Sequence, residues 1–180
     1  LFQPAGGNGT EENPIIISSY GVGSRPVIEG ASTYSNTLVI NNGSWWTLRG
    51  LEFRGAKMGP QFLYTTLQNE GIVIEDNYIH DLVGGPVATA LHVRCDSYDV
   101  IPEDTDDAWI AKNVLIQNNV IGPTSSYGIV VMNSNTAAKA NALQNVIVKN
   151  NQLYRVSAKA IVFQCVKDSY WLGNYVDDAA

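Results

Sequence analysis

Three polar side chains alternate with apolar ones in the segment ALHVRCD, residues 90–96. Side chains of a β-strand point to opposite faces in turn, so a strand that buries the apolar residues presents His92, Arg94 and Asp96 on its other face. Such a set can do chemistry, because His92 can take or give a proton, Arg94 can neutralise a carboxylate, and Asp96 can bind a cation or act as an acid. The alternative is a solvated strand face with a local ion pair.

The segment that follows is acidic. It begins DSYDVIPEDTDD and concentrates the carboxylates of Asp96, Asp99, Glu103, Asp104, Asp106 and Asp107. Hard oxygen ligands at this density can hold calcium, and we take Asp104, Asp106 and Asp107 as the candidate ligands. The spacing matches no defined calcium loop, and a solvated acidic loop is the alternative. Two of these carboxylates held roughly 5–9 Å apart would also suit glycoside hydrolysis.

Composition and charge exclude several classes of protein. The chain has 180 residues, and its 11 basic residues against 17 acidic ones give a net charge of −6, which disfavours binding to nucleic-acid phosphates. No apolar run is long enough for a membrane span, and the first residues, LFQPAGGNGT, lack the pattern of a signal peptide. We expect one domain over residues 1–180, mature or trimmed, with no membrane span and no nucleic-acid partner.

A short unit recurs along the chain and indicates how such residues would be held. Its mark is a pair, Asp-Asn or Asn-Asn, that ends at Asn77, Asn119 and Asn151, and a degraded copy ends at Asn174. Alternating apolar residues precede each pair and one apolar residue follows it, as in GIVIEDNYIH and NVLIQNNVIG. Alternation of period two predicts strands, and no helical period is sustained.

A second family of strands lies between these units: TLVINN, ALHVRC, GIVVMN and AIVFQC. Each repeat therefore carries three short strands. Asparagine tolerates the left-handed backbone conformation, so the asparagine pair predicts a sharp corner between strands. Stacked copies would lie ~4.8 Å apart, where side-chain amides can bond to the coils above and below, and apolar residues would pack on those of the next coil.

These features resemble the right-handed parallel β-helix proteins of the pectate-lyase-like superfamily. The resemblance rests on V-x-I-x-[DN]-N-x-I at the corners, on the strand triplets, and on NPIIISSYGVGSRPVIEG at residues 13–30, which is similar to the first coil of many secreted polysaccharide lyases. It implies an all-β solenoid of about six coils, three short strands per coil, and a secreted or cell-surface location. It also implies a lyase or glycoside hydrolase that acts on a polysaccharide, possibly one with uronate units. The groove is expected on the strand that precedes the longest loops, which here is residues 90–96. Calcium is a cofactor of many such lyases.

The sequence departs from that family at its ends, where no capping element is visible. A trimmed fragment, contact with another chain, and end-to-end self-association would each account for this. The alternative function is therefore a non-catalytic structural, adhesive or filament-forming module that assembles through uncapped coil ends. The residues expected beside the polar triplet in later coils, Val130, Met132, Val162 and Gln164, are mostly apolar and indicate cover by a loop or another chain.

Two other sequence features concern cysteine and histidine. Cys95 and Cys165 fall in one inward column with Asn133 between them, so they would lie two coils apart, ~9.6 Å, which is too far for a disulfide. We predict two free, buried thiols. His80 and Asp81 follow a strand at a point where such repeats turn, and we predict a turn rather than a catalytic site there.

Overall fold

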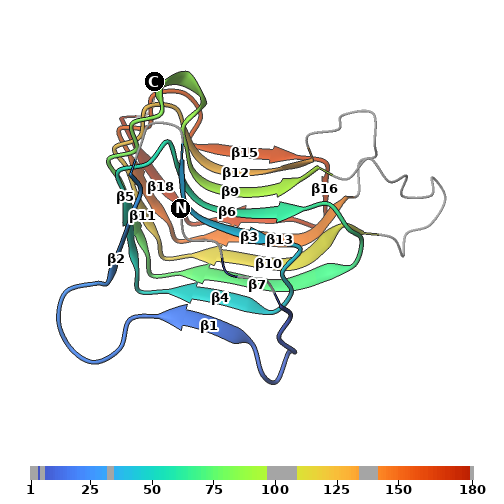
Figure 1. The fold of residues 1–180 in the computed structure, drawn as a ribbon. Coiled ribbons are helices and arrows are strands. Elements are labelled where there is room, and N and C mark those ends of the chain that lie inside the picture. The colour runs from blue at the N-terminus through green and yellow to red at the C-terminus, as the bar shows by residue number, and fades with distance from the viewer. Residues whose placement is uncertain (1–3, 5–6, 32–34, 97–108, 134–141, 179–180) are drawn as a thin grey trace.

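The computed structural model describes residues 4, 7–31, 35–96, 109–133 and 142–178. Short parallel strands make up most of this part of the chain, together with one 3-10 turn, η1 (Gly85–Val87). The strands form three sheets, which the chain visits in a repeating order so that each circuit stacks on the previous one (Figure 1). We name the sheets A, B and C.

Sheet B contains β1 (Ile15–Ser18), β4 (Trp46–Arg49), β7 (Asn69–Glu75), β10 (Ala111–Gln117), β13 (Leu143–Lys149), β16 (Val166–Lys167) and β17 (Tyr170–Leu172). Sheet C contains β2 (Val27–Glu29), β5 (Glu52–Arg54), β8 (Tyr78–Ile79), β11 (Val120–Ile121), β14 (Gln152–Tyr154) and β18 (Tyr175–Asp177). Sheet A contains β3 (Asn36–Asn41), β6 (Met58–Tyr64), β9 (Thr89–Cys95), β12 (Tyr127–Asn133) and β15 (Ile161–Gln164).

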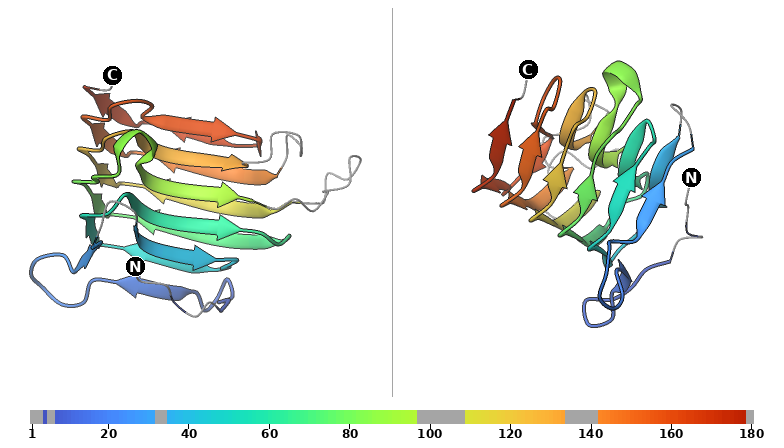
Figure 2. Two further views of the ribbon diagram at one scale, coloured as in Figure 1. Left: turned by 45° about the horizontal axis from the view of Figure 1, so that its top comes forward. Right: turned by 90° about the vertical axis from the view of Figure 1, so that its left-hand side faces the viewer.

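This topology is a parallel β-helix, as predicted. The chain runs from sheet B to sheet C to sheet A in each coil, and the six strands of sheet C mark six coils. Strands β16 and β17 both pair with β13, so together they form the sixth sheet-B strand. Figure 2 shows the coils as a regular stack, with the first coil at one end and the sixth at the other.

The core consists of apolar columns that run through the stack. Ile74 pairs with Ile116, and Ile116 pairs with Val148, so one inward position repeats from coil to coil. All three side chains are fully buried. Burial of a side chain of this size contributes about 1.5–3 kcal/mol, and repeating it in every coil stabilises the whole stack.

The predicted asparagine corners lie between sheets B and C, and they form a continuous ladder of hydrogen bonds. The side-chain Oδ1 of Asn119 accepts from the backbone N–H and the Nδ2 of Asn77 at 3.1 and 3.0 Å. Its Nδ2 donates to Oδ1 of Asn151 at 2.9 Å and to the carbonyl of Ile74 at 2.9 Å. The pattern continues to Asn174, so amides that are fully buried in the middle of the stack keep all their partners.

The two residues of each corner pair have different tasks. The first residue has a left-handed backbone, with φ of 56° at Asp76, 56° at Asn118 and 55° at Asn150. The second residue points inward and makes the ladder. In the second coil Gly50 takes the left-handed place, and Leu51 ends the ladder by donating its backbone N–H to Oδ1 of Asn77.

The cysteine prediction is confirmed in its main point. Neither cysteine forms a disulfide, and the register places Asn133 beside Cys95 in the next coil. Cys95 is fully buried, and burial raises the pKa of its thiol. Cys165 is only partly buried, so the prediction of burial was wrong for this residue.

The structure also bears on membrane association. Among the residues that it describes, no helix has the length and apolar character needed to cross a bilayer.

We predict that Asn119→Ala destabilises the fold far more than a change at the residue before it. The substitution removes the side-chain partners of the buried backbone N–H of Asn77 and of the carbonyl of Ile74, so the free energy of unfolding should fall by about 3–5 kcal/mol in urea denaturation. Asn118→Gly is the matched control, because glycine suits a φ of 56° and should change stability by less than about 1 kcal/mol. Equal losses for both variants would contradict the division of roles.

Candidate functional site

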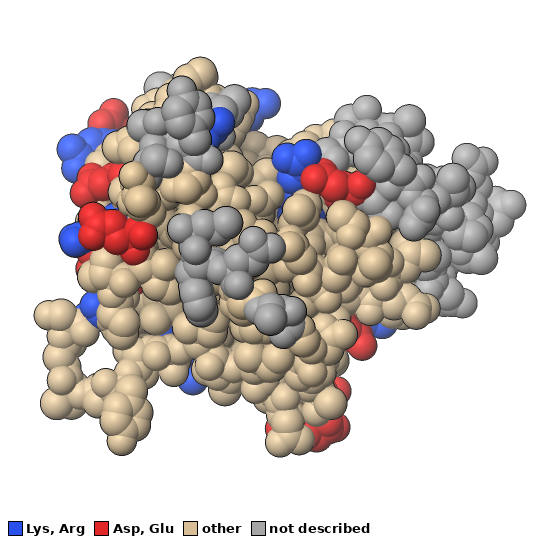
Figure 3. Space-filling view, viewed as in Figure 1, with Lys and Arg blue, Asp and Glu red and all other residues tan. Residues whose placement is uncertain are grey.

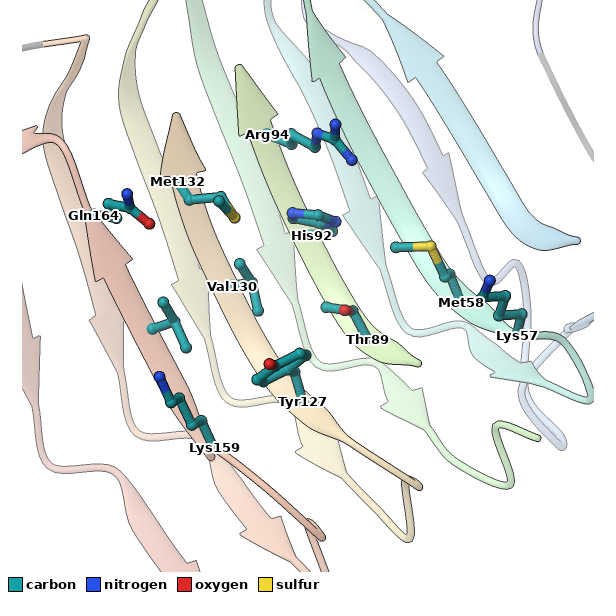
Figure 4. A pocket seen from close by; sticks show the side chains of 11 residues that line it. Lys57, Met58, Thr89, His92, Arg94, Tyr127, Val130, Met132, Lys159 and Gln164 are labelled. Carbon is teal, nitrogen blue, oxygen red and sulfur yellow. The ribbon is translucent and has the colours of Figure 1, made fainter. Parts of the chain in front are cut away.

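A hollow of about 440 Å³ lies on the outer face of sheet A (Figure 4). Its lining comes from the loops and strands of four successive coils. The lining residues are Lys57, Met58, Thr89, His92, Arg94, Tyr127, Val130, Met132, Lys159, Val162 and Gln164. Two members of the predicted triplet, His92 and Arg94, therefore lie in one site.

The register of sheet A explains this arrangement. His92 is flanked by Gln61 in the preceding coil and by Val130 in the next. Arg94 lies beside Met132, which lies beside Gln164 in the coil after that. The stacking expected from the sequence is thus confirmed, and the apolar side chains of these columns form walls of the hollow.

His92 occupies the centre of the hollow and is nearly buried. Its side chain comes from the outer face of β9, yet the residue is only 6% exposed. Both ring nitrogens are buried, and neither has a hydrogen-bond partner among the residues that the structure describes. Burial is the main cause that lowers the pKa of His92 to about 4; Arg94 adds to this shift and Asp96 opposes it. The imidazole is therefore neutral at pH 7, with a hydrogen on one ring nitrogen and a lone pair on the other.

Arg94 and Asp96 form an ion pair at the carboxyl-terminal end of β9, with 2.5 Å between Nε and Oδ1. The two side chains are 38% and 25% exposed, so they remain in contact with solvent. Asp96 is not among the residues that line the hollow. The triplet thus divides into a buried histidine and a neighbouring ion pair.

Two lysines and a tyrosine complete the polar lining, and the sequence analysis missed all three. Lys57, Tyr127 and Lys159 lie toward the amino-terminal ends of the sheet-A strands, whereas Arg94 lies toward the carboxyl-terminal ends (Figure 4). Tyr127 pairs with Thr89 in the preceding coil. Extending the strand alignment two residues upstream would have found Tyr127 and Lys159 in one column, since Ile129 pairs with Ile161.

The predicted calcium ligands Asp104, Asp106 and Asp107 lie outside the residues that the structure describes. Within the described ranges, no three His, Cys, Asp or Glu side chains are grouped so that they could hold a metal ion. Calcium stays a prediction from the sequence.

A second group of charged residues lies on sheet C, where acidic and basic side chains alternate along the side of the molecule (Figure 3). Arg54 pairs with both Glu29 and Glu52, and His80 contacts Glu52 at 3.2 Å and Asp81 at 2.8 Å. Asp81 has a φ of 49°, as the predicted turn requires. These charges are largely satisfied by one another. Asp81 also lines a separate hollow of about 370 Å³, together with Arg155.

Comparisons with known proteins give only distant likenesses. No protein-family model matches the chain, and no curated protein matches it in sequence. Among solved structures, an alginate lyase from Paenibacillus sp. strain FPU-7 is similar, with 15% identity over 98% of this chain and 87% of that chain and a TM-score of 0.38. A GH136 lacto-N-biosidase from Eubacterium ramulus is also similar, with 13% identity, a TM-score of 0.48, and coverage of 94% of this chain and 47% of its own. At these values the likeness says nothing about activity.

We predict that His92 makes stability depend on pH. Its pKa is about 4 in the folded chain and about 6.5 when unfolded, so the unfolded state binds more protons between these values. The stabilisation from keeping it neutral is therefore complete above pH 6.5 and is lost as the pH falls toward 4, by about 3 kcal/mol.

Urea denaturation of the wild type and of His92→Gln across this pH range measures the effect. Carboxylates contribute equally to both proteins, so the difference between them isolates the histidine. The wild type should lose more stability on acidification, and NMR titration should show one of the two histidines still neutral at pH 5. Parallel pH profiles for the two proteins would contradict the prediction.

Proposed function

We propose that this chain is a carbohydrate-active β-helix protein that cleaves a uronate-containing polysaccharide by β-elimination in the hollow on sheet A. The observation that carries the proposal is His92: a neutral, buried and unpartnered imidazole that lies in a cavity with three cationic side chains.

The charge of the hollow favours an acidic sugar. Lys57, Arg94 and Lys159 line it, and the described lining includes no carboxylate, although the chain as a whole carries a charge of −6. A cationic hollow in an acidic protein attracts anions to that place. Arg94 is also suited to bidentate contact with a carboxylate, because its guanidinium is solvent-accessible and already binds one in Asp96.

The same groups suit the chemistry of elimination. A cation beside the uronate carboxylate acidifies the adjacent C5–H, and His92 takes that proton on the one ring nitrogen that carries a lone pair in the neutral imidazole. The electron pair forms the C4–C5 double bond while the C4–O4 bond breaks. The departing oxygen needs a proton, for which the Tyr127 phenol in the lining is the candidate donor.

Glycoside hydrolysis fits the described site less well. That reaction generally uses two carboxyl groups on either side of the scissile bond. Asp96 is the carboxylate nearest to His92 along the strand, and it is held by Arg94 outside the lining. We therefore propose a lyase rather than a hydrolase.

A polymeric substrate of this kind lies outside cells, and a secreted or cell-surface location is part of the proposal. Calcium could assist by binding the same carboxylate, through Asp104, Asp106 and Asp107. No step above depends on it.

A non-catalytic, self-associating module is the second candidate, and exposed apolar side chains favour it. Tyr170, Trp171, Leu172 and Tyr175, on β17 and β18 of the sixth coil, are each more than half exposed. Large apolar groups gathered in one region of a surface are typical of contacts with further protein. This candidate requires no chemistry in the hollow.

We predict that the hollow supports turnover of a polyuronate such as alginate or polygalacturonate, measured by the ultraviolet absorbance of the unsaturated product. His92→Gln removes the base and should lower kcat by ~10²–10⁴-fold. Arg94→Ala should lower kcat/KM by ~100-fold or more, because it removes the group that neutralises the carboxylate.

The matched control for Arg94→Ala is Arg49→Ala. Arg49 is an ion-paired arginine on sheet B, and its removal takes away the ion-pair partner of Glu75, just as Arg94→Ala takes away that of Asp96. The control should keep full activity. A wild type that releases no unsaturated product from any polyuronate, while binding one, would overturn the elimination mechanism.

We also predict the outcome for the second candidate. If the exposed side chains of the sixth coil mediate assembly, Tyr175→Asp should shift the particle mass in light scattering from an oligomer to a monomer. Tyr175 is 62% exposed, so the change leaves the core intact, whereas Val176 packs against the core and a charge there would unfold the coil. A wild type that is monomeric at high concentration would exclude self-association through this surface.

A further inference from the structure

A second hollow, of about 420 Å³, lies on the outer face of sheet B, away from the sheet that carries His92. It is lined by Glu11, Pro14, Trp45, Thr47, Gly71, Val73 and Asn113. The mixture of one aromatic ring, apolar side chains and a few polar groups is typical of small-ligand sites. The proposed lyase chemistry uses none of these residues.

Trp45 has a backbone conformation that its residue type disfavours. Its φ is 58°, and a left-handed backbone is a genuine outlier for a bulky residue. The neighbouring coils place Gly71, Asn113, Asn145 and Asp168 at the same step, all with positive φ. Those are the types that accept this conformation readily. The backbone alone would therefore favour Gly, Asn or Asp at position 45.

The next coil has a glycine, Gly71, at the position that corresponds to Trp45. Because no side chain occupies that place, the Trp45 ring can lie on the surface of the sheet. A Cβ built on Gly71 would be 2.2, 2.4 and 2.7 Å from three adjacent carbons of the six-membered ring. Three such short distances describe a point over the face of the ring rather than beyond its edge. The indole thus lies flat across the Gly71 backbone and forms one wall of the hollow.

Polar groups surround this ring. Oδ1 of Asn113 accepts from Nδ2 of Asn145 at 2.8 Å, and its own Nδ2 makes only a long contact of 3.5 Å to Glu70. Lys112 is engaged elsewhere, since it lies 3.8 Å from Glu70 and 3.6 Å from the Trp109 ring centre. The charged group in the described lining is the carboxylate of Glu11.

We propose that this hollow is a second carbohydrate site, which binds one unit of a neutral glycan by stacking it on the Trp45 indole. A flat aromatic wall matches the apolar face of a sugar ring, and the Asn113 amide and the Glu11 carboxylate can bond its hydroxyl groups. Glu11 disfavours an acidic sugar, which is the opposite preference to that of the cationic hollow on sheet A. The strained backbone at Trp45 is then a cost retained for binding.

Fluorescence and calorimetric titrations with four neutral hexasaccharides test the proposal: cellohexaose, mannohexaose, xylohexaose and galactohexaose. At least one should bind saturably to the wild type, and a polyuronate hexasaccharide should not compete for the site. Trp45→Asn, which installs the residue type that Asn113 and Asn145 provide at this step in later coils, should weaken binding roughly tenfold or more. Trp45→Phe keeps an aromatic face and should restore most of the affinity.

Two controls separate this site from the first. Trp171→Asn removes another exposed tryptophan and should leave neutral-sugar binding unchanged. His92→Gln should also leave it unchanged, so failure of the lyase proposal would not affect this result. The inference is overturned if none of the four hexasaccharides binds, if folded Trp45→Asn binds as the wild type does, or if the polyuronate displaces the neutral sugar.

Discussion

The hydrogen-bonded asparagine ladder is the constraint on which the rest of this structure depends. At each corner between sheets B and C the backbone turns away from the regular pairing of the strands, and a buried N–H or carbonyl without a partner there would cost about 1–3 kcal/mol. The amide of Asn119 supplies partners to the coil before it and takes one from the coil after it. Each amide can bond to its neighbour only if the two asparagines occupy equivalent positions in successive coils. The ladder therefore fixes the register of each coil relative to the next. A slip of one residue would break the ladder and turn the apolar columns outward.

Because the register is fixed, residues that are far apart in the sequence lie next to one another and form sites. The hollow on sheet A draws its lining from four coils, and His92 is buried because Gln61 and Val130 stand on either side of it at the same step. The burial that lowers the pKa of His92 is therefore a property of the stack rather than of its own strand. The hollow on sheet B has the same origin, since the Trp45 ring can lie flat only because the coil above supplies Gly71 at that step.

The sequence predicted those features that repeat with short period. Alternating apolar residues and the asparagine pairs indicated strands, corners, three sheets and about six coils, because each of these depends on residues close together in the chain. It did not distinguish the left-handed Asn118 from the inward Asn119, since both residues are asparagine and asparagine suits either place. It missed Lys57 and Lys159, which lie before their strands and reach the site only through stacking. The burial of His92 depends on neighbours 31 and 38 positions away, at Gln61 and Val130, and no local pattern reports it.

The two hollows show how one rigid scaffold can carry opposite preferences. Lys57, Arg94 and Lys159 make the sheet-A hollow attractive to anions, whereas Glu11 makes the sheet-B hollow unattractive to them. The sheet-A hollow is built mainly from side chains on strands that hydrogen bonds tie to their neighbours, so little conformational entropy is lost there when a ligand binds. The hollows open on different sheets of the coil, and a single sugar unit cannot reach both. If one glycan with acidic and neutral units spanned both hollows, its contact at Trp45 would raise the effective concentration of its acidic units near His92.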